Sequence, residues 1–285
     1  MNERWLYELP ISDIKRCIPV TGGDVNQAYR VITSNCDYFL LVQPQSNINF
    51  YEGEIAGLSL FEQIGIQAPR VIAHGQIMGD SYLLLNYLKK GFGKQSDLGK
   101  IVAQLHHYNS PNNRYGFNVK YQGSEMAFDN SWTDTWSEIF IDRRLDPLSE
   151  MIGSKNLWAK NDFDQYRKAR EIINESLKQH KSKPSLLHGD LWGGNYMFLE
   201  DGSPALIDPA CFYGDREFDV GITTVFGGFS KDFYESYQES YPLDEGFNLR
   251  INFYRLYYLM VHLNKFGSIY ASSVNTVMQK ILAKK

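Results

Sequence analysis

The spacing of hydrophobic residues changes near Ser96, and this change constrains the fold more than any other feature of the sequence. Residues 21–33, 36–43, 70–77 and 81–88 are short apolar, aromatic and β-branched runs, which are typical of strands. Beyond Ser96 the apolar residues recur at three- and four-residue steps, which is typical of helices. We therefore predict an α+β, bilobal chain with a small β-rich lobe followed by a larger α-helical lobe.

Helix signals refine this division. One helix is expected within residues 49–65, where Gly65 follows the last apolar repeat as a C-cap does. Ser96 is a plausible N-cap for the first helix of the second lobe. Further helices are expected over 132–145, 163–180 and 247–270. We place the two lobes at residues 1–88 and 89–285, with a ligand cleft expected between them.

Composition excludes several classes of protein. The 285 residues carry a formal net charge of −4, which disfavours a non-specific nucleic-acid binder. No apolar run is long enough to span a membrane, and the first residues do not form an apolar leader. Cys17, Cys36 and Cys211 are scattered, as free thiols are in a reducing compartment. We therefore expect a cytoplasmic protein that binds neither nucleic acid nor membrane.

The chemistry is concentrated in "SLLHGDLWGGNYMF" and the "LIDPA" that follows it. Asp190 and Asn195 are five positions apart, and Asp208 lies further on, after a short apolar run. This is the spacing of phosphoryl-transfer enzymes, in which one carboxylate accepts the proton of the attacking hydroxyl while amide and carboxylate oxygens hold Mg²⁺. Asp190 is the candidate base, and Asn195 and Asp208 are the candidate metal ligands. The alternative is a loop in which "HGD" forms an ordinary Asx turn.

Three further residues have weaker functional signals. His188, two positions before the candidate base, is interpreted as a residue that orients the loop by hydrogen bonding, since no His or Cys partner lies at metal-ligand spacing. Gly22 and Gly23 precede a predicted strand, where glycines let backbone N–H groups approach phosphate oxygens. A simple turn explains the two glycines equally well.

Five segments together resemble the fructosamine kinase (ketosamine-3-kinase) family, which is related to aminoglycoside and choline kinases. They are "GGDVNQAYRV", "FYEGEIAGLSLF", "LLHGDLWGGN", "IDPACFYGDREFDVGI" and "FGGF", and they cover about residues 18–270. The resemblance implies a protein-kinase-like fold, the cofactors ATP and Mg²⁺, and transfer of the γ-phosphate to a hydroxyl of a sugar attached to an amine. The acceptor would be a free sugar amine or a glycated protein side chain.

The resemblance also implies roles for individual residues. Asp190 becomes the base, Asn195 and Asp208 the magnesium ligands, and Trp192 a neighbour of the acceptor. In the first lobe, Gly22 and Gly23 would lie over the phosphates. The remaining implied residues are Asn86, Tyr87 and Leu88 as the hinge that meets adenine through its backbone, Glu54 as the helix glutamate, and Glu217 and Asp219 as buttresses of the catalytic loop.

One position departs from the family pattern. The family has a lysine that binds the α- and β-phosphates and pairs with the helix glutamate. The best match places Leu41 at that position, a shift of one residue would place Leu40 there, and the chain has no lysine between Lys15 and Lys89. The cations within that stretch are Arg16, Arg30 and Arg70. The alternative to an active kinase is therefore a degenerate kinase-fold protein that binds a ligand with weak or no catalysis. A choline- or aminoglycoside-type acceptor is a third possibility.

Overall fold

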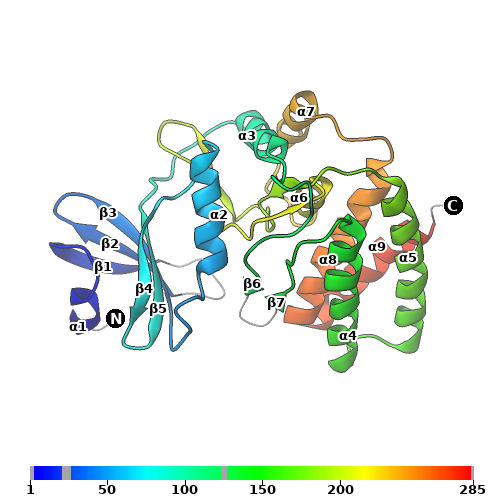
Figure 1. Ribbon diagram of the computed structural model, residues 1–285, viewed down its shortest axis with the longest axis horizontal. Coiled ribbons are helices and arrows are strands. Elements are labelled where there is room, and N and C mark those ends of the chain that lie inside the picture. Colours follow the sequence, from blue (N-terminus) through cyan, green and yellow to red (C-terminus); the bar gives the residue numbers. More distant parts are fainter. Residues whose placement is uncertain (1–2, 21–26, 123–126, 284–285) are drawn as a thin grey trace. The chain divides into compact units, whose positions relative to one another are not determined.

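The computed structural model describes residues 3–20, 27–122 and 127–283, which form two compact units (Figure 1). One unit comprises Met1–Lys94 together with Met197–Pro209, and the other comprises Gln95–Tyr196 and Ala210–Lys285. The first is built on an antiparallel sheet and the second is helical, so the predicted α+β class is confirmed. The assignment of nucleotide binding to residues 1–88 and of catalysis to 89–285 stays a prediction.

The sheet unit contains five antiparallel strands in the order β1-β2-β3-β5-β4. Hydrogen bonds pair β2 with β3 across the turn at residues 34–36, where Thr33 Oγ1 accepts from the Cys36 N–H and caps the turn. Helix α2 runs along β4 and β5 (Figure 1) and ends before Gly65, whose φ of +73° gives the left-handed C-terminal turn expected from the sequence. The elements are α1 Glu3–Tyr7, β1 Ile14–Val20, β2 Gln27–Thr33, β3 Asp37–Gln43, α2 Glu52–Gln63, β4 Val71–Ile77, β5 Asp80–Asn86 and β10 Pro204–Leu206, which pairs with β9 Tyr196–Phe198.

The two neighbouring leucines of strand β3, Leu40 and Leu41, lie on opposite faces of the sheet. Leu40 and Val42 are buried in a cluster with Trp5 of α1 and Val31 of β2. Because side chains alternate along a strand, Leu41 lies on the opposite face of the sheet from Trp5. The apolar contacts of α1 thus cover one face, and Leu41 belongs to the other.

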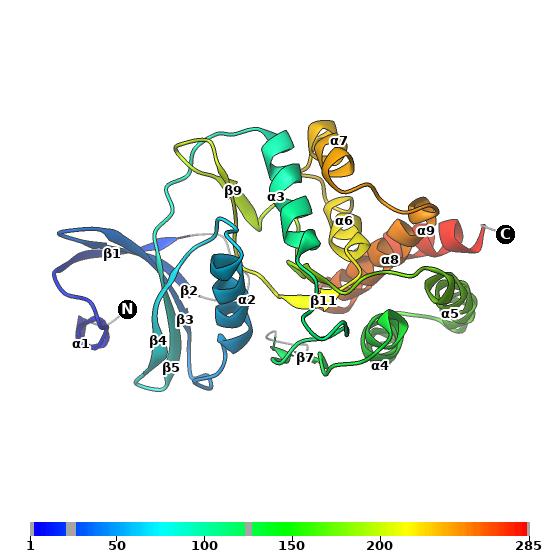
Figure 2. The ribbon, with the colours of Figure 1, turned by 45° about the horizontal axis from the view of Figure 1, so that its top comes forward.

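The helical unit is larger. Its helix α3 packs against α7, α6 packs against α8, and α9 packs against both α5 and α8 (Figure 2). In the part of the chain that the structure describes, no helix combines the length and hydropathy of a membrane span. The elements are α3 Gln95–His107, β6 Tyr121–Gln122, β7 Ala127–Phe128, the π-helix η1 Glu138–Leu145, α4 Asp146–Ser154, α5 Lys160–Gln179, β8 Ser185–Leu187, β11 Phe212–Gly214, α6 Glu217–Thr223, α7 Lys231–Ser240, α8 Phe247–Phe266, the 3₁₀ helix Ser268–Tyr270 and α9 Ala271–Leu282.

Stacked aromatic rings form the core of the helical unit. Trp136 stacks on Phe140 and on Phe212, and Phe140 meets Tyr254 edge-on with 4.9 Å between ring centroids. Offset and edge-on aromatic pairs stabilise a core beyond the area that they bury. The indole Nε1 of Trp136 donates to the hydroxyl of Tyr254 at 3.0 Å, which gives the buried indole its polar partner. This core supports β11 and α6, the two elements behind the candidate catalytic loop.

Candidate active site

The loop that carries the candidate base begins at the end of β8, which pairs with β11. Asp190 lies in this loop, and its carboxylate has a donor on each oxygen. The Tyr258 hydroxyl of α8 donates to Oδ1 at 2.9 Å. The Asn195 side-chain amide donates to Oδ2 at 3.0 Å and also to the Asp190 carbonyl at 2.8 Å. The structure thus brings Asp190 and Asn195 together, as the sequence spacing suggested.

The orientation of Asn195 leaves its oxygen available. Both hydrogen bonds of the amide use Nδ2, and within the described residues no donor contacts Oδ1. Asn195 is 4% exposed, so its amide is fixed by the surrounding protein. An amide oxygen held in this way fits a hard divalent cation, which selects oxygen ligands.

Backbone contacts with Asp219 of α6 fix the start of the loop. The Asp219 carboxylate accepts from the His188 N–H at 2.6 Å and from the Gly189 N–H at 3.0 Å, and His106 Nε2 lies 3.2 Å from it. The expected role of Asp219 as a buttress of the loop is confirmed by these bonds. His188 is buried, and its Nδ1 accepts from the Asp190 N–H at 3.3 Å, which is an orienting contact.

Gly189 is required by the close approach of two backbone segments. Its φ is +84°, and a Cβ at this position would lie 2.0 Å from the Ala210 carbonyl oxygen. The Ala210 N–H donates to the His188 carbonyl at 2.8 Å, so the segment before β11 is tied to the loop at the residue directly before the glycine. A side chain at position 189 would separate these segments.

Trp192 lies beyond the base and is 41% exposed. Its indole ring covers Gly194, where a Cβ would come within 2.3 Å of the ring. The loop is closed beneath it by the Asn195 N–H, which donates to the Trp192 carbonyl at 2.9 Å. The position is compatible with contact to an acceptor, and that role stays a prediction.

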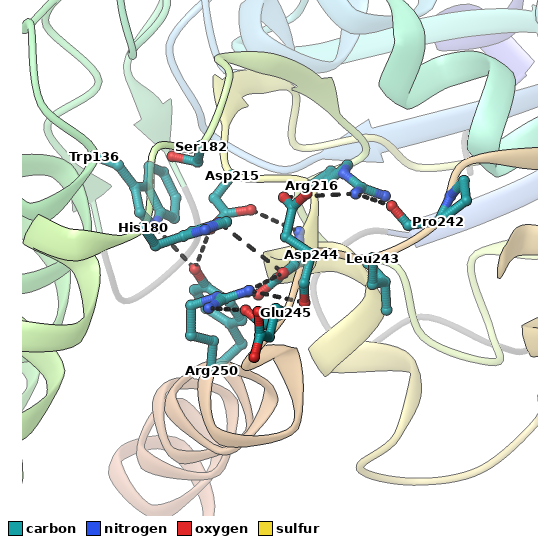
Figure 3. Close-up of polar contacts among 12 residues, drawn as sticks. Trp136, His180, Ser182, Asp215, Arg216, Pro242, Leu243, Asp244, Glu245 and Arg250 are labelled. Atoms are coloured by element: carbon teal, nitrogen blue, oxygen red, sulfur yellow. Dashed lines mark hydrogen bonds and ion pairs between the residues drawn. The ribbon is translucent and has the colours of Figure 1, made fainter.

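A buried ionic network lies behind β11 (Figure 3). Arg250 of α8 donates two bonds of 2.7 Å to the two carboxylate oxygens of Glu217. His180, at the end of α5, places Nε2 3.1 Å from Asp215 Oδ2 and 3.9 Å from Glu217 Oε1. Asp215 also accepts from the Tyr254 hydroxyl at 2.8 Å. Glu217 therefore contacts α8 and not the loop, which differs from the buttress role expected of it.

This network favours a protonated His180 over a bound metal ion. His180, Glu217 and Asp244 bring one ligand atom each within 4.8 Å of one another. Arg250 already occupies both oxygens of Glu217, however. Burial opposes the charged imidazole, but the bond to Asp215 and the charges of Asp215 and Glu217 outweigh it and raise the pKa of His180. Desolvation of Asp215 is likewise outweighed by its contacts with His180, and the pKa of Asp215 is lowered.

Asp208 and Glu54 belong to the sheet unit. Asp208 follows β10 with a φ of +52°, a left-handed conformation that aspartate tolerates. Desolvation raises the pKa of Asp208, and desolvation together with the charge of Asp208 raises the pKa of Glu54 in the first turn of α2. The two carboxyl groups thus lie within electrostatic range of each other, and a cation between them would relieve their repulsion.

None of the three arginines considered as substitutes for the lysine contacts Glu54. Arg30 pairs with Asp37 and stacks on the Tyr87 ring, with 4.5 Å from its guanidinium carbon to the ring centroid. Arg70 lies 3.4 Å from Glu62. Arg16 is exposed on β1. The family lysine is therefore not replaced at Glu54 by any of them.

The expected hinge residues continue from β5. The Asn86 N–H donates to the Arg70 carbonyl at 3.0 Å, and the Tyr87 N–H donates to the Asp37 carbonyl at 3.2 Å. Among the described residues, none accepts a bond from the Leu88 N–H. If this segment meets adenine through its backbone, Leu88 supplies the donor. Gly22 and Gly23 lie outside the described residues.

A five-stranded antiparallel sheet, a helical unit, and a loop with paired Asp and Asn define a protein-kinase-like phosphotransferase. An aminoglycoside phosphotransferase with ADP and hygromycin B bound has the same fold, with a TM-score of 0.66 at 12% identity over 94% of each chain. The family model described as fructosamine kinase matches residues 4–284. The chain belongs to the fructosamine kinase family.

Two further relatives agree with this assignment. The chain is 56% identical to a probable ketoamine kinase of Staphylococcus aureus over 99% of this chain and 98% of the relative. It is also similar to the crystal structure of a putative fructosamine-3-kinase from Haemophilus somnus, with a TM-score of 0.85 and 29% identity over 94% of this chain and 92% of that one. These matches cover the sheet unit as well as the helical unit. The chain is accordingly a small-molecule kinase.

Sequence reasoning missed Tyr258. It lies in the predicted helix 247–270, where its aromatic neighbours make it look like an ordinary core residue. Its contact with Asp190 spans 68 positions of sequence. No local pattern signals such a bond, because it depends on how α8 packs beside the loop.

Proposed function

We propose that this protein transfers the γ-phosphoryl group of ATP to a hydroxyl of a ketosamine, a sugar joined to an amine. The amine would belong to a free molecule or to a glycated protein side chain. The observation that carries the proposal is the carboxylate of Asp190, which accepts a hydrogen bond on each oxygen. Asn195 of the same loop has an amide oxygen that no donor among the described residues contacts. Membership of the fructosamine kinase family supports the choice of acceptor.

Each proposed role follows from the chemistry of the group. Asp190 accepts the proton of the acceptor hydroxyl as the oxygen attacks the γ-phosphorus, and the bond to the β-phosphate oxygen breaks to release ADP. Trp192 offers an exposed ring to the sugar. Leu88 offers its backbone N–H to adenine. Gly22 and Gly23 are assigned to the phosphates.

The side chains proposed as metal ligands are of the type that Mg²⁺ prefers. Asn195 and Asp208 are the proposed ligands, and Glu54 is a further carboxylate in electrostatic range of Asp208. Bound Mg²⁺ supplies positive charge to the phosphate oxygens. In this chain that charge has added weight, because Leu41 stands where the family lysine would supply some of it.

The rival reading is a kinase-fold protein that binds a ligand without phosphorylating it. The missing lysine motivates it, and in the described part of the chain Arg16, Arg30 and Arg70 have no contact with Glu54. The intact Asp190 and Asn195 pair and the kinase names of the relatives favour catalysis.

The test is phosphorylation of fructosyl-lysine by the purified chain with ATP and Mg²⁺, followed by mass spectrometry of the product and by ADP release. The wild type is expected to add one phosphate per sugar. Asp190→Ala should abolish turnover and leave the unfolding transition unchanged, because Asp190 is a loop residue outside the core. Full activity in Asp190→Ala would remove this residue from the mechanism.

Calorimetry separates the rival reading from the proposal. Nucleotide binding by the wild type without phosphorylation of fructosyl-lysine, ribulosyl-lysine or an aminoglycoside would establish a binding protein. Phosphorylation of the aminoglycoside in preference to both ketosamines would move the proposal to another acceptor class.

A further inference from the structure

The hydroxyl of Tyr258 is a donor to the Asp190 carboxylate from outside the loop. It lies 2.9 Å from Oδ1 and comes from α8, whereas the donor to Oδ2, Asn195, belongs to the loop itself. Asp190 and Asn195 can move together as the loop moves, because they share one short segment. A donor on α8 fixes the position of the carboxylate relative to the core of the helical unit.

The Tyr258 ring is held firmly enough to fix the position of the Asp190 carboxylate. Tyr258 is 7% exposed, and its ring packs beside Phe226 and His262 with centroid separations of 5.7 Å and 4.7 Å. Its helix is anchored near the N-terminus by the two bonds from Arg250 to Glu217. A rigid donor on a helix positions a reactive group more closely than a donor on a loop does.

We infer that Tyr258 is a positioning residue for the phosphoryl transfer, which holds the Asp190 carboxylate at the rotation needed to accept the proton of the acceptor hydroxyl. The inference rests on the proposed function. With a donor on each oxygen, the rotation of the carboxylate group is fixed. The tyrosine keeps its own proton throughout, and it acts through Asp190 and not on the phosphate.

The experiment compares steady-state kinetics of the wild type and Tyr258→Phe with ATP and fructosyl-lysine. Tyr258→Phe keeps the ring and its packing and removes only the hydroxyl. We expect kcat to fall about tenfold, the rate factor that corresponds to about 1.4 kcal/mol. The KM values for ATP and for fructosyl-lysine should stay within about twofold of the wild type, since a positioning role is expressed in the transition state.

Tyr234→Phe is the matched control. It removes a partly buried tyrosine hydroxyl that lies 3.2 Å from the Thr223 hydroxyl and that makes no hydrogen bond to Asp190. It should retain the kcat of the wild type. Urea unfolding of both variants separates a kinetic effect from a loss of fold.

A double-mutant cycle tests whether Tyr258 acts through Asp190. The residual single-turnover rates of Asp190→Ala, too slow to detect in steady-state turnover, are measured with radiolabelled ATP with and without Tyr258→Phe. A positioning residue adds no further loss once the carboxylate is gone. Equal loss in both backgrounds would overturn the inference.

Two other results would also overturn it. One is a Tyr258→Phe kcat within about twofold of the wild type, and the other is a rise in KM at constant kcat, which would indicate a binding role. If Asp190→Ala itself keeps full activity, Asp190 leaves the mechanism and the role of Tyr258 falls with it, whereas the proposed function fails only if the wild type does not phosphorylate the ketosamine. A silent Tyr258→Phe beside an inactive Asp190→Ala leaves the proposed function standing and rejects only the role of Tyr258.

Discussion

Removal of Arg250 should expose how strongly the buried ionic network holds the helical unit together. The Arg250 side chain donates two bonds of 2.7 Å to Glu217, and the side chains of Arg250 and Glu217 are 6% and 0% exposed. It also donates to the Glu245 carbonyl at 3.0 Å. In Arg250→Met the Glu217 carboxylate stays buried without these donors.

Breaking a buried pair by removing one partner costs about 3–5 kcal/mol, because the remaining charge is left uncompensated. For a unit of this size the melting temperature should fall by about 10 °C, at about 2–4 °C per kcal/mol. Burial raises the pKa of Glu217, and the bonds from Arg250 oppose that rise. Without Arg250 the folded state takes up a proton on Glu217 more readily, so the loss of stability should shrink as the pH falls.

Urea unfolding of Arg250→Met at pH 8 and at pH 5 measures both effects. The double variant Glu217→Leu/Arg250→Met is the control, because it removes both charges and keeps apolar volume. It should be more stable than Arg250→Met alone. A loss below about 1 kcal/mol in the single variant, or a double variant less stable than the single one, would refute the electrostatic reasoning.

Three further predictions concern single positions. The pKa of His180 is raised in the folded state, so its protonated form contributes stability that is fully present below the unfolded pKa of about 6.5 and is lost as pH rises through the folded value. In urea unfolding, His180→Gln should therefore differ from the wild type more at pH 6 than at pH 9. A pH-independent difference would contradict this. Gly189→Ala should lower the free energy of unfolding by more than about 2 kcal/mol, because it adds a clash to the strain of a left-handed backbone. The control Gly65→Ala, which has no atom within 4 Å of its Cβ, should cost about 1–2 kcal/mol. Equal shifts of the unfolding midpoint would show that the clash is relieved. Leu41→Lys should tighten ATP binding about tenfold in calorimetry, since it offers the phosphates and Glu54 a cation worth about 1.5–3 kcal/mol per charge-assisted bond; unchanged affinity in a folded variant would place position 41 away from the phosphates.

The sequence predicted the elements whose hydrophobic pattern is local. The change of period near Ser96 separated strands from helices, and helix α8 within 247–270 was visible from its spacing. Strand β1 was not predicted, because it is mostly exposed and has Pro19 near its end. The segment 132–145 was expected to be an ordinary helix and contains the π-helix η1, whose wider turn no residue pattern signals.

The candidate site was predictable where its residues lie close in sequence. Asp190 and Asn195 share one loop, so their spacing sufficed. The contact of Asp219 with the loop was expected from the family motif, whereas the pairing of Glu217 with Arg250 was not. Such long-range contacts depend on helix packing, and residues in a helix show only which face is apolar.

The aromatic core described above also makes the protein its own optical reporter. Trp136 is buried and bonded to the Tyr254 hydroxyl, which in turn donates to Asp215 beside His180. Its emission should therefore respond to protonation of the imidazole through two hydrogen bonds. Trp192 is exposed and open to collisional quenchers such as acrylamide. In a variant with the other three tryptophans, Trp5, Trp132 and Trp158, replaced by phenylalanine, quenching thus separates two fluorescence signals, one from the loop surface and one from the buried charges behind it.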